Sequence, residues 1–313
     1  ADEWVLPYIG DLLGASLLHN IDSAEGYSTR AHVANTIRYR RRKGTLSVLE
    51  QLARDVTNWN ARVVEIFQLL AATQHVNHIR LDNFRTPHLR APYANASARN
   101  GANRLELLST PFTNAARTVE VRNIASGRGL WNIPNIAIYL WRLESYPLQR
   151  VTARALSNPA DGRFFFHPSG IDIPLFNLGQ TEDDISHLAQ EHNVPGPLRR
   201  RALYDDLAAY RAELAKPDGS PESTYFGANP VLQIYPDGQA DPLLPEEIAI
   251  CDLSDWEAAG WVPPSSVSFN YSDGTPFKTK VGVDPALGRL AVLDGAGSID
   301  AFNVSYYYGF SGD

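Results

Sequence analysis

The chain has 313 residues, of which 44% are hydrophobic and 20% are charged, and its formal net charge is −7. This length and apolar content suffice for one large hydrophobic core or two ordinary ones, and they exclude a disordered or fibrous protein. The acidic balance disfavours nucleic acid as a partner, because non-specific binding to phosphates requires a basic surface. No apolar run approaches the roughly 20 residues of a membrane-spanning helix, so we expect no membrane insertion by this chain.

The cysteine content and the chain ends bear on where the protein is made. Cys251 is the only cysteine, which excludes an internal disulfide framework and is typical of a reducing compartment. Asp2 and Glu3 occupy the region in which a secretory signal carries basic residues, so we expect no signal peptide. Methionine is absent, and the last strand-like segment stops just before the chain does. We therefore expect the chain to be part of a longer protein.

Residues 1–84 have the pattern of a helical module. The apolar segment from Trp4 to Leu18 is interrupted by proline and glycine, which favours a short broken helix. Apolar residues at helical spacing then predict helices at 33–37 and 48–56 and a third one over 63–70. Helices this short bury little core by themselves and gain from packing against a partner.

A basic run, Arg38 to Lys43, lies between the first two of these helical stripes. Gly44 can take the left-handed conformation that ends a helix, and Thr45 can cap the next one. We call residues 38–45 the basic elbow. It has three interpretations: a solvated helix end, a nucleic-acid contact, or a docking surface for an acidic partner. The residues alone favour the solvated helix end.

The pattern changes after residue 84. Residues 85–104 are rich in Pro, Asn, Ala and Arg without periodicity and predict a linker. Residues 105–180 then predict a β module. Its expected strands are an alternating one at Thr118–Arg122, a buried one at Ile136–Trp141 and an aromatic one at Gly162–His167.

The last third of the chain predicts a helical insertion at 181–216 and an antiparallel β module at 217–313. The helix begins near Thr181, is broken by Pro195 and Pro197, and continues to Leu214. Six strand-like segments follow: 231–235, 248–253, 267–271, 279–283, 289–293 and 299–307. The predicted fold class is therefore α+β, a bundle of short N-terminal helices followed by an antiparallel β-sandwich-like region with a helical insertion.

Signatures of catalysis and metal binding are weak. His75 and His78 have a spacing that two metal ligands could use, but only Asp82 lies nearby as a third. Three further residues have the composition but not the spacing of a metallopeptidase signature: His187, Glu191 and His192. We expect these side chains to be ordinary polar residues, with no metal and no cofactor bound.

Nucleophile and nucleotide signatures are missing as well. There is no Gly-x-Ser-x-Gly, and Cys251 lies in an apolar strand-like setting typical of an inert thiol. Gly127-Arg128-Gly129 lacks the third glycine of a dinucleotide fingerprint. Trp256 and Trp261, beside a Pro-Pro pair, are interpreted as loop anchors or interface residues.

Strings in the first quarter of the chain resemble tail protein I of contractile-tailed phages. They are Leu6-Pro7-Tyr8-Ile9-Gly10-Asp11-Leu12, Tyr39-Arg40-Arg41-Arg42-Lys43-Gly44-Thr45 and Leu49-Glu50-Gln51-Leu52-Ala53. Two later segments, 283–291 and 304–311, are similar to segments of longer members in phage-like extracellular contractile injection systems. The long β region and the elbow's Arg-Arg-Arg-Lys depart from the short phage proteins, which leaves the role of the β region open.

The resemblance implies a structural baseplate wedge subunit and no enzyme. It implies helical contacts with baseplate J-like subunits, linking the hub and spike to sheath-proximal proteins. It also implies synthesis in a bacterial cytoplasm and assembly into a phage tail or an injection-system particle. The residues that match the family motifs form the candidate interface: Leu6, Pro7, Tyr8, Arg40, Arg42, Lys43, Gly44, Thr45, Leu49 and Leu52.

Two other classes of protein remain open from the sequence. A carbohydrate-active or other hydrolase with a β-sandwich would show a pocket with two converging carboxylates and aromatic walls. A β-sandwich adhesin or binding module would show a wet aromatic loop surface. A wedge subunit instead predicts apolar patches left exposed on the isolated chain.

Overall fold

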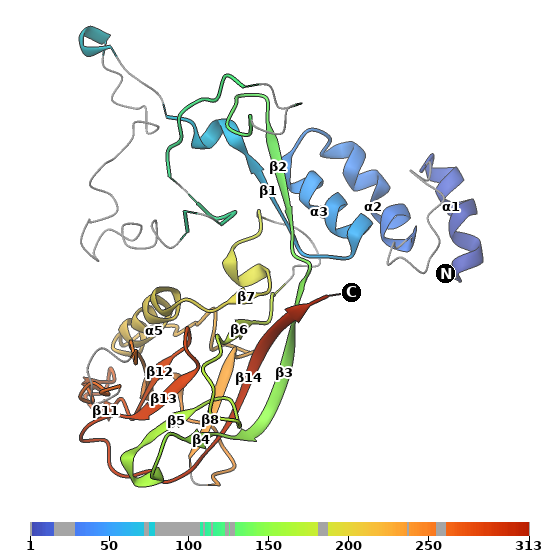
Figure 1. The fold of residues 1–313 in the computed structure, drawn as a ribbon. Helices are drawn as coiled ribbons and strands as arrows, with labels where there is room; N and C mark the ends of the chain where they lie inside the picture. Colours follow the sequence, from blue (N-terminus) through green and yellow to red (C-terminus); the bar gives the residue numbers. More distant parts are fainter. Residues whose placement is uncertain are drawn as a thin grey trace. The chain divides into compact units, whose positions relative to one another are not determined.

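The computed structural model (Figure 1) describes residues 2–15, 29–71, 75–78, 107–108, 110–113, 115–122, 125, 129–180, 187–236, 238–254 and 261–312. The chain forms two compact units. Unit 1 comprises Ala1–Arg142 and Gln180–Val194, and unit 2 comprises Leu143–Gly179 and Pro195–Asp313. The predicted α+β class is confirmed: short N-terminal helices precede strands that are mostly antiparallel, with a helix among them.

The boundaries of the two units do not coincide with two of the segments predicted from the sequence. The 105–180 segment and the 181–216 segment each contribute to both units. The expected linker at 85–104 lies outside the described residues, as do Asp82, Thr181 and Trp256. Gly127 and Arg128 lie outside them too.

Unit 1 begins with helices, as the sequence predicts. A 3-10 turn, η1 (Glu3–Val5), runs into α1 (Leu6–Leu13), which ends at Gly14 with a φ of 67°. The basic elbow then joins α2 (Thr29–Arg41) to α3 (Leu46–Thr57). The predicted helix–glycine–helix hairpin is therefore confirmed.

The predicted third helix is wrong. Residues 61–65 form strand β1 (Ala61–Glu65), followed by the 3-10 turn η3 (Ile66–Leu69). Asn58 ends α3 in a left-handed conformation with a φ of 57°, and the β-branched pair Val63 and Val64 then pairs with β2. The apolar spacing of this segment fits both periods, and strand pairing decides between them. A further 3-10 turn, η4 (Val76–His78), follows.

The strand expected at Ile136–Trp141 exists as β2 (Ile136–Leu140), but it is not buried. It forms a two-stranded antiparallel sheet with β1, and its residues alternate between half-buried and exposed. The strand expected at Thr118–Arg122 is absent from the described residues: this segment has no regular secondary structure, although the Glu120 N–H donates to the Trp131 carbonyl. Strand β2 is not buried because α3 packs mainly on β1, so the rest of this sheet is only partly covered.

Unit 2 contains two larger sheets. The five-stranded sheet has the order β4 (Arg154–Ala155), β5 (Arg163–Phe165), β13 (Arg289–Val292), β12 (Val281–Asp284) and β9 (Ile248–Ile250). The three-stranded sheet has the order β3 (Leu143–Thr152), β14 (Phe302–Ser311) and β8 (Leu232–Pro236). All of these pairs are antiparallel except β9 and β12, which run parallel.

Smaller elements complete unit 2. Two short antiparallel pairs are formed by β6 (Phe176–Asn177) with β7 (Gly196–Pro197) and by β10 (Ser268–Asn270) with β11 (Pro276–Lys278). The 3-10 turns are η7 (Pro159–Asp161) and η9 (Pro245–Glu247). Of the predicted inserted helix, residues 181–186 lie outside the described residues, and the part near the C-terminal end is α5 (Arg200–Leu214). It begins after Pro195 and Pro197, which keep the segment directly before it extended. Before them, the described residues form η8 (Glu191–Asn193) in unit 1.

The two larger sheets and α5 enclose one hydrophobic core. Phe164 of β5 meets Phe302 of β14 edge to face, with ring centroids 5.0 Å apart, and Leu203 and Leu207 of α5 are fully buried. Each such side chain stabilises the fold by roughly 1.5–3 kcal/mol through burial. In the described part of the chain, every helix is too short or too polar to cross a lipid bilayer.

Candidate partner interface

Helix α1 packs on α2 through its inner face. Leu6 and Gly10 are buried there, and a Cβ placed on Gly10 would lie 3.4 Å from Cγ2 of Val33. Glycine therefore permits the two helices to approach closely at this point. Leu6, a candidate interface residue, serves this intramolecular contact.

The outer face of α1 and its preceding turn is also apolar. Trp4, Tyr8 and Leu12 recur every four residues, and their exposed fractions are 72%, 66% and 88%. Side chains four apart lie on one face of a helix, so these three form a continuous stripe opposite Leu6 and Gly10. We call this set the α1 stripe. A helix that is apolar on two faces is typical of an element packed on both sides.

The basic elbow is a tight turn. Its Gly44 has a φ of 89°, and no other atom lies within 4 Å of a Cβ placed there. Thr45 occupies the N-cap position of α3, but its hydroxyl donates to the Arg42 carbonyl at 2.9 Å and does not cap the helix. The side chains of Arg41, Arg42 and Lys43 are exposed.

Arg40 connects the elbow to the end of α1. Its Nη1 donates to the Leu13 carbonyl at 2.7 Å and its Nη2 to the Gly14 carbonyl at 2.6 Å. A cation at a helix C-terminus satisfies free carbonyls and interacts favourably with the helix dipole. Arg40 therefore positions α1, whereas Arg41 and Lys43 are exposed.

Asp55 of α3 holds α2 and α3 together. Its carboxylate accepts hydrogen bonds from the Tyr39 hydroxyl, from Asn35 Nδ2 at 2.8 Å and from Gln51 Nε2 at 2.8 Å. Burial, together with the hydrogen bond to this anion, raises the pKa of Tyr39 well above its ordinary value. This network fixes the angle at which the elbow presents its cations.

The structure thus separates the ten candidate residues into three groups. Leu6 and Arg40 make contacts within unit 1, and Leu49 and Leu52 are half-buried on α3. Six are exposed on α1 or in the elbow: Pro7, Tyr8, Arg42, Lys43, Gly44 and Thr45. Trp4 lies outside the strings that carry the resemblance and Leu12 lies within one, and neither is among the ten candidates, although their spacing of four from Tyr8 is visible in the sequence.

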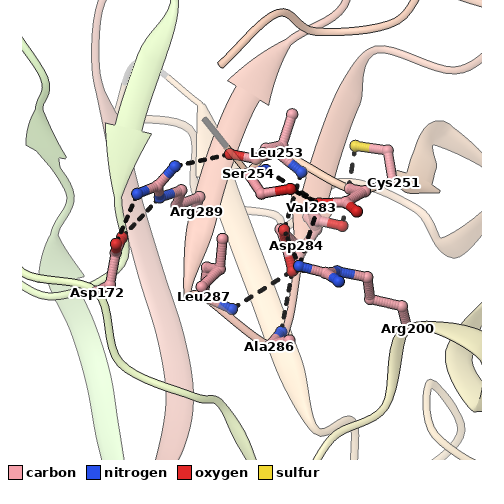
Figure 2. Close-up of polar contacts among 11 residues, drawn as sticks. Asp172, Arg200, Cys251, Leu253, Ser254, Val283, Asp284, Ala286, Leu287 and Arg289 are labelled. Atoms are coloured by element: carbon pink, nitrogen blue, oxygen red, sulfur yellow. Dashed lines mark hydrogen bonds and ion pairs between the residues drawn. The ribbon is translucent and has the colours of Figure 1, made fainter. Parts of the chain in front are cut away.

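A polar network surrounds the β12–β13 hairpin of unit 2, within the 283–291 segment (Figure 2). Asp284 is fully buried, and its carboxylate accepts from Arg200 Nε at 2.7 Å and Nη2 at 2.8 Å. The backbone N–H groups of Leu253 and Ala286 also donate to it, at 2.9 and 3.1 Å. Because its oxygens are occupied by structural partners, this carboxylate stabilises the hairpin and is not poised for proton transfer.

Arg289 forms the second half of this network. It makes a bidentate pair with Asp172, at 2.6 Å for both bonds, and its Nη1 donates to the Leu253 carbonyl at 2.7 Å. Its guanidinium also lies over the ring of Trp261, 4.3 Å from the centroid. Trp261 is 1% exposed and packs on Phe165, so the interpretation of Trp261 as a loop anchor is confirmed.

Described residues of unit 2 form two notable pockets. An apolar one of about 660 Å³ lies between α5 and the strands around β9 and β10, and Arg211 and Cys251 are part of its wall. Burial raises the pKa of the Cys251 thiol to about 12, which keeps it protonated and unreactive at neutral pH. The other, of about 430 Å³, lies on the three-stranded sheet beside Arg150. Neither pocket is lined by an aspartate or a glutamate.

The four histidines considered as metal ligands lie in two separate pairs. His75 and His78 are exposed around η4, with ring centroids 5.8 Å apart, and the rings of His187 and His192 lie 6.5 Å apart in another part of unit 1. Within the described ranges, no three His, Cys, Asp or Glu side chains are grouped so that they could hold a metal ion.

Comparison of the chain with protein-family models, with curated proteins and with solved structures finds no match. The geometry of the α1 stripe and the basic elbow therefore carries the functional interpretation, together with the motif resemblance.

Proposed function

We propose that this chain is a non-enzymatic structural subunit of the baseplate wedge in a contractile tail or contractile injection system. In this proposal its N-terminal helices dock on helices of baseplate J-like subunits, and the wedge links the hub and spike to sheath-proximal proteins. The chain is made in a bacterial cytoplasm and assembled into the particle. The observation that carries the proposal is the exposed α1 stripe: Trp4, Tyr8 and Leu12.

The stripe supports docking because of its size and regularity. Single exposed apolar side chains are common on soluble proteins, whereas an aromatic and aliphatic row along one helix face is typical of a recognition surface. Large aromatic side chains also provide much of the binding energy at protein interfaces. The partner that fits a straight apolar row is a second helix with its own apolar face.

The charge beside the stripe supports the choice of an acidic helix as partner. Arg41, Arg42 and Lys43 are exposed at the C-terminal end of α2, and Arg40 ties this end to the end of α1. An acidic flank on the docking helix would meet these cations, and such complementarity selects the partner and its register. The overall net charge of −7 makes this local cationic surface distinctive within the chain.

Paired substitutions test the proposal in cells that build the particle. Tyr8→Lys and Leu12→Lys place charges in the α1 stripe without altering its buried face, so the chain should fold but be lost from purified particles. Val121→Lys is the matched control, because Val121 is 97% exposed elsewhere in unit 1. Circular dichroism of each isolated chain checks folding. Particles that retain both stripe variants at wild-type stoichiometry would exclude docking through α1.

A further inference from the structure

The hydrogen bonds that flank the β1–β2 pair fix which backbone groups face outward. The Trp141 N–H donates to the Asn60 carbonyl at 2.9 Å, and the Ile66 N–H donates to the Asn135 carbonyl at 3.1 Å. In an antiparallel pair, every second residue bonds across the ladder and those between point away from it. The outward residues of β2 are therefore Ile136, Ile138 and Leu140.

At the centre of its outer edge, β1 is covered by a buried carboxylate. Glu50 is 2% exposed, and its Oε2 accepts from the outward Val63 N–H at 3.0 Å. Its Oε1 accepts from the Ala189 N–H at 2.7 Å, and Arg62 donates to the Ala189 carbonyl. These contacts satisfy the central N–H group of the β1 edge, at Val63, and place Glu50 beside it in place of another strand.

The outer edge of β2 has no such cover. Among the described residues, neither a strand nor a side chain pairs with the outward groups of Ile136, Ile138 and Leu140. The side chains of the same three residues are 48%, 51% and 41% exposed. An apolar strand with a free edge is a template for pairing with another strand, and soluble proteins normally protect such an edge with charge, proline or a bulge.

We infer that the free edge of β2 pairs with the same edge of a second copy of this chain, antiparallel about Ile138. The sequence Ile136-Ala137-Ile138-Tyr139-Leu140 is complementary to itself in this register. Ile138 meets Ile138 of the second copy, and Ile136 meets its Leu140, so branched aliphatic side chains form one row. On the other face Ala137 meets Tyr139 of the second copy, small against large. All of these residues are uncharged.

A proline limits the length of this strand pairing at one end, and every outward N–H and C=O group of β2 has a partner in it. Pro134, which has no backbone N–H, precedes β2 and ends the ladder. Each pair of outward residues exchanges two hydrogen bonds, which joins the two-stranded sheets into one of four strands. The surface shares no residue with the α1 stripe or the basic elbow, so the inference does not rest on the proposed function.

Sedimentation velocity of the purified full chain over a concentration series is the first measurement. Because the paired edge is far smaller than a standard interface, we expect association with a dissociation constant between about 10 µM and 1 mM. Ile138→Lys should weaken association by about tenfold or more, since two ammonium groups would meet at the twofold axis. Ile138→Thr keeps a β-branched residue and should weaken it less.

Two controls identify the surface. Val121→Lys changes another exposed apolar residue of unit 1, and Tyr8→Lys changes the α1 stripe; both should associate like the wild type. Amide hydrogen exchange gives an independent readout, because the amides of Ile136, Ile138 and Leu140 should exchange freely when dilute and slow several-fold when concentrated. A chain that stays monomeric throughout overturns the inference. So does slow exchange of these amides at the lowest concentration, or association that Tyr8→Lys abolishes and Ile138→Lys does not.

Discussion

Unit 1 and unit 2 differ in which way their rows of apolar side chains, repeated at helical or strand spacing, face. In unit 2, the rows on β5 and β14 face inward, and Phe164, Phe302 and Tyr306 are at most 2% exposed. In unit 1, two rows face outward: the α1 stripe and the outward residues of β2. In unit 2, Ile171 and Leu244 are exposed singly in loops, whereas Tyr308 and Phe310 are exposed two residues apart near the C-terminal end of β14. A row at helical or strand spacing is a surface that packs, whereas a single exposed residue needs no explanation.

Apart from the pair Tyr308 and Phe310, the apolar rows of unit 2 close a core within one chain, whereas both rows of unit 1 present surfaces suited to partners. The polar contacts follow the same division. The network of Asp284 and Arg289 lies within one hairpin and its neighbours, whereas the elbow cations Arg41 and Lys43 are exposed. The predictions that follow test this division.

Removing the fully buried carboxylate of Asp284 should have the largest effect. Asp284→Ala leaves Arg200 and the Leu253 N–H without their partner and should cost about 3 kcal/mol of unfolding free energy. This is at the lower end for a buried ion pair, because the Arg200 side chain is 34% exposed. Hydrogen exchange should show lost protection around β12 and β13 while α2 and α3 keep theirs. The control Asp252→Ala, at a surface pair with Arg200, should cost less than about 1 kcal/mol. Equal loss in both units would contradict independent cores.

Alkaline conditions should also weaken unit 2. Burial raises the pKa of the Cys251 thiol from 9.0 to about 12 and that of the Tyr306 hydroxyl from 10.0 to about 12. Because both folded pKa values are raised, the unfolded chain loses these protons first. The contribution of these two groups to the free energy of unfolding is therefore fully present below pH 9 and is lost as the pH rises toward 12. Urea unfolding at pH 8 and pH 11 measures this, and Cys251→Ala should reduce the slope. An unchanged midpoint across this range would show that these groups are not buried.

A change of Gly44 should have an intermediate effect on unit 1. Gly44→Val forces a β-branched residue to a φ of 89° and should cost about 1–2 kcal/mol, without any steric clash because the surrounding space is open. Gly44→Asn should cost less, since asparagine tolerates the left-handed region better. Thermal unfolding followed by circular dichroism compares the two variants. A valine variant as stable as the wild type would mean that the elbow adopts another turn.

The smallest effect is expected from a comparison of Arg40 with its neighbour Arg41. Arg40→Gln removes the guanidinium bonds to the Leu13 and Gly14 carbonyls and should cost about 0.5–1 kcal/mol, with faster amide exchange in α1. Arg41→Gln, one residue later and exposed, should leave that exchange unchanged and weaken only partner binding. If the two variants behave alike in the isolated chain, Arg40 has no special role in positioning α1.

Local signals in the sequence predict part of this fold. The hairpin around Gly44 follows from a glycine between two stripes of helical period, and most C-terminal strands follow from alternation between Gly, Pro and Asp clusters. Strand β1 does not follow, because Val63, Val64 and Phe67 fit either period until β2 pairs with them. Strand β3 contains Pro147, which is compatible with a strand only at a sheet edge, and that position is fixed by distant β14.

For the candidate interface too, local signals predict one part and long-range contacts determine the rest. The motif leads to Tyr8 and to the elbow, but burial of Leu6 and the contacts of Arg40 depend on how α1 meets α2, which spacing alone does not give. The parallel pairing of β9 with β12 is likewise a long-range contact without a local signal. By contrast, the positions of Trp4 and Leu12 in the exposed row could have been predicted from their spacing of four residues on either side of Tyr8.

The most direct test of the central claim is the native mass of the protein purified from its own source, with chains cross-linked near Tyr8 identified by mass spectrometry. The proposal predicts a large particle that contains sheath, tube and baseplate J-like subunits, with the latter cross-linked to α1. A chain recovered as a monomer, with no protein cross-linked to α1, would contradict it.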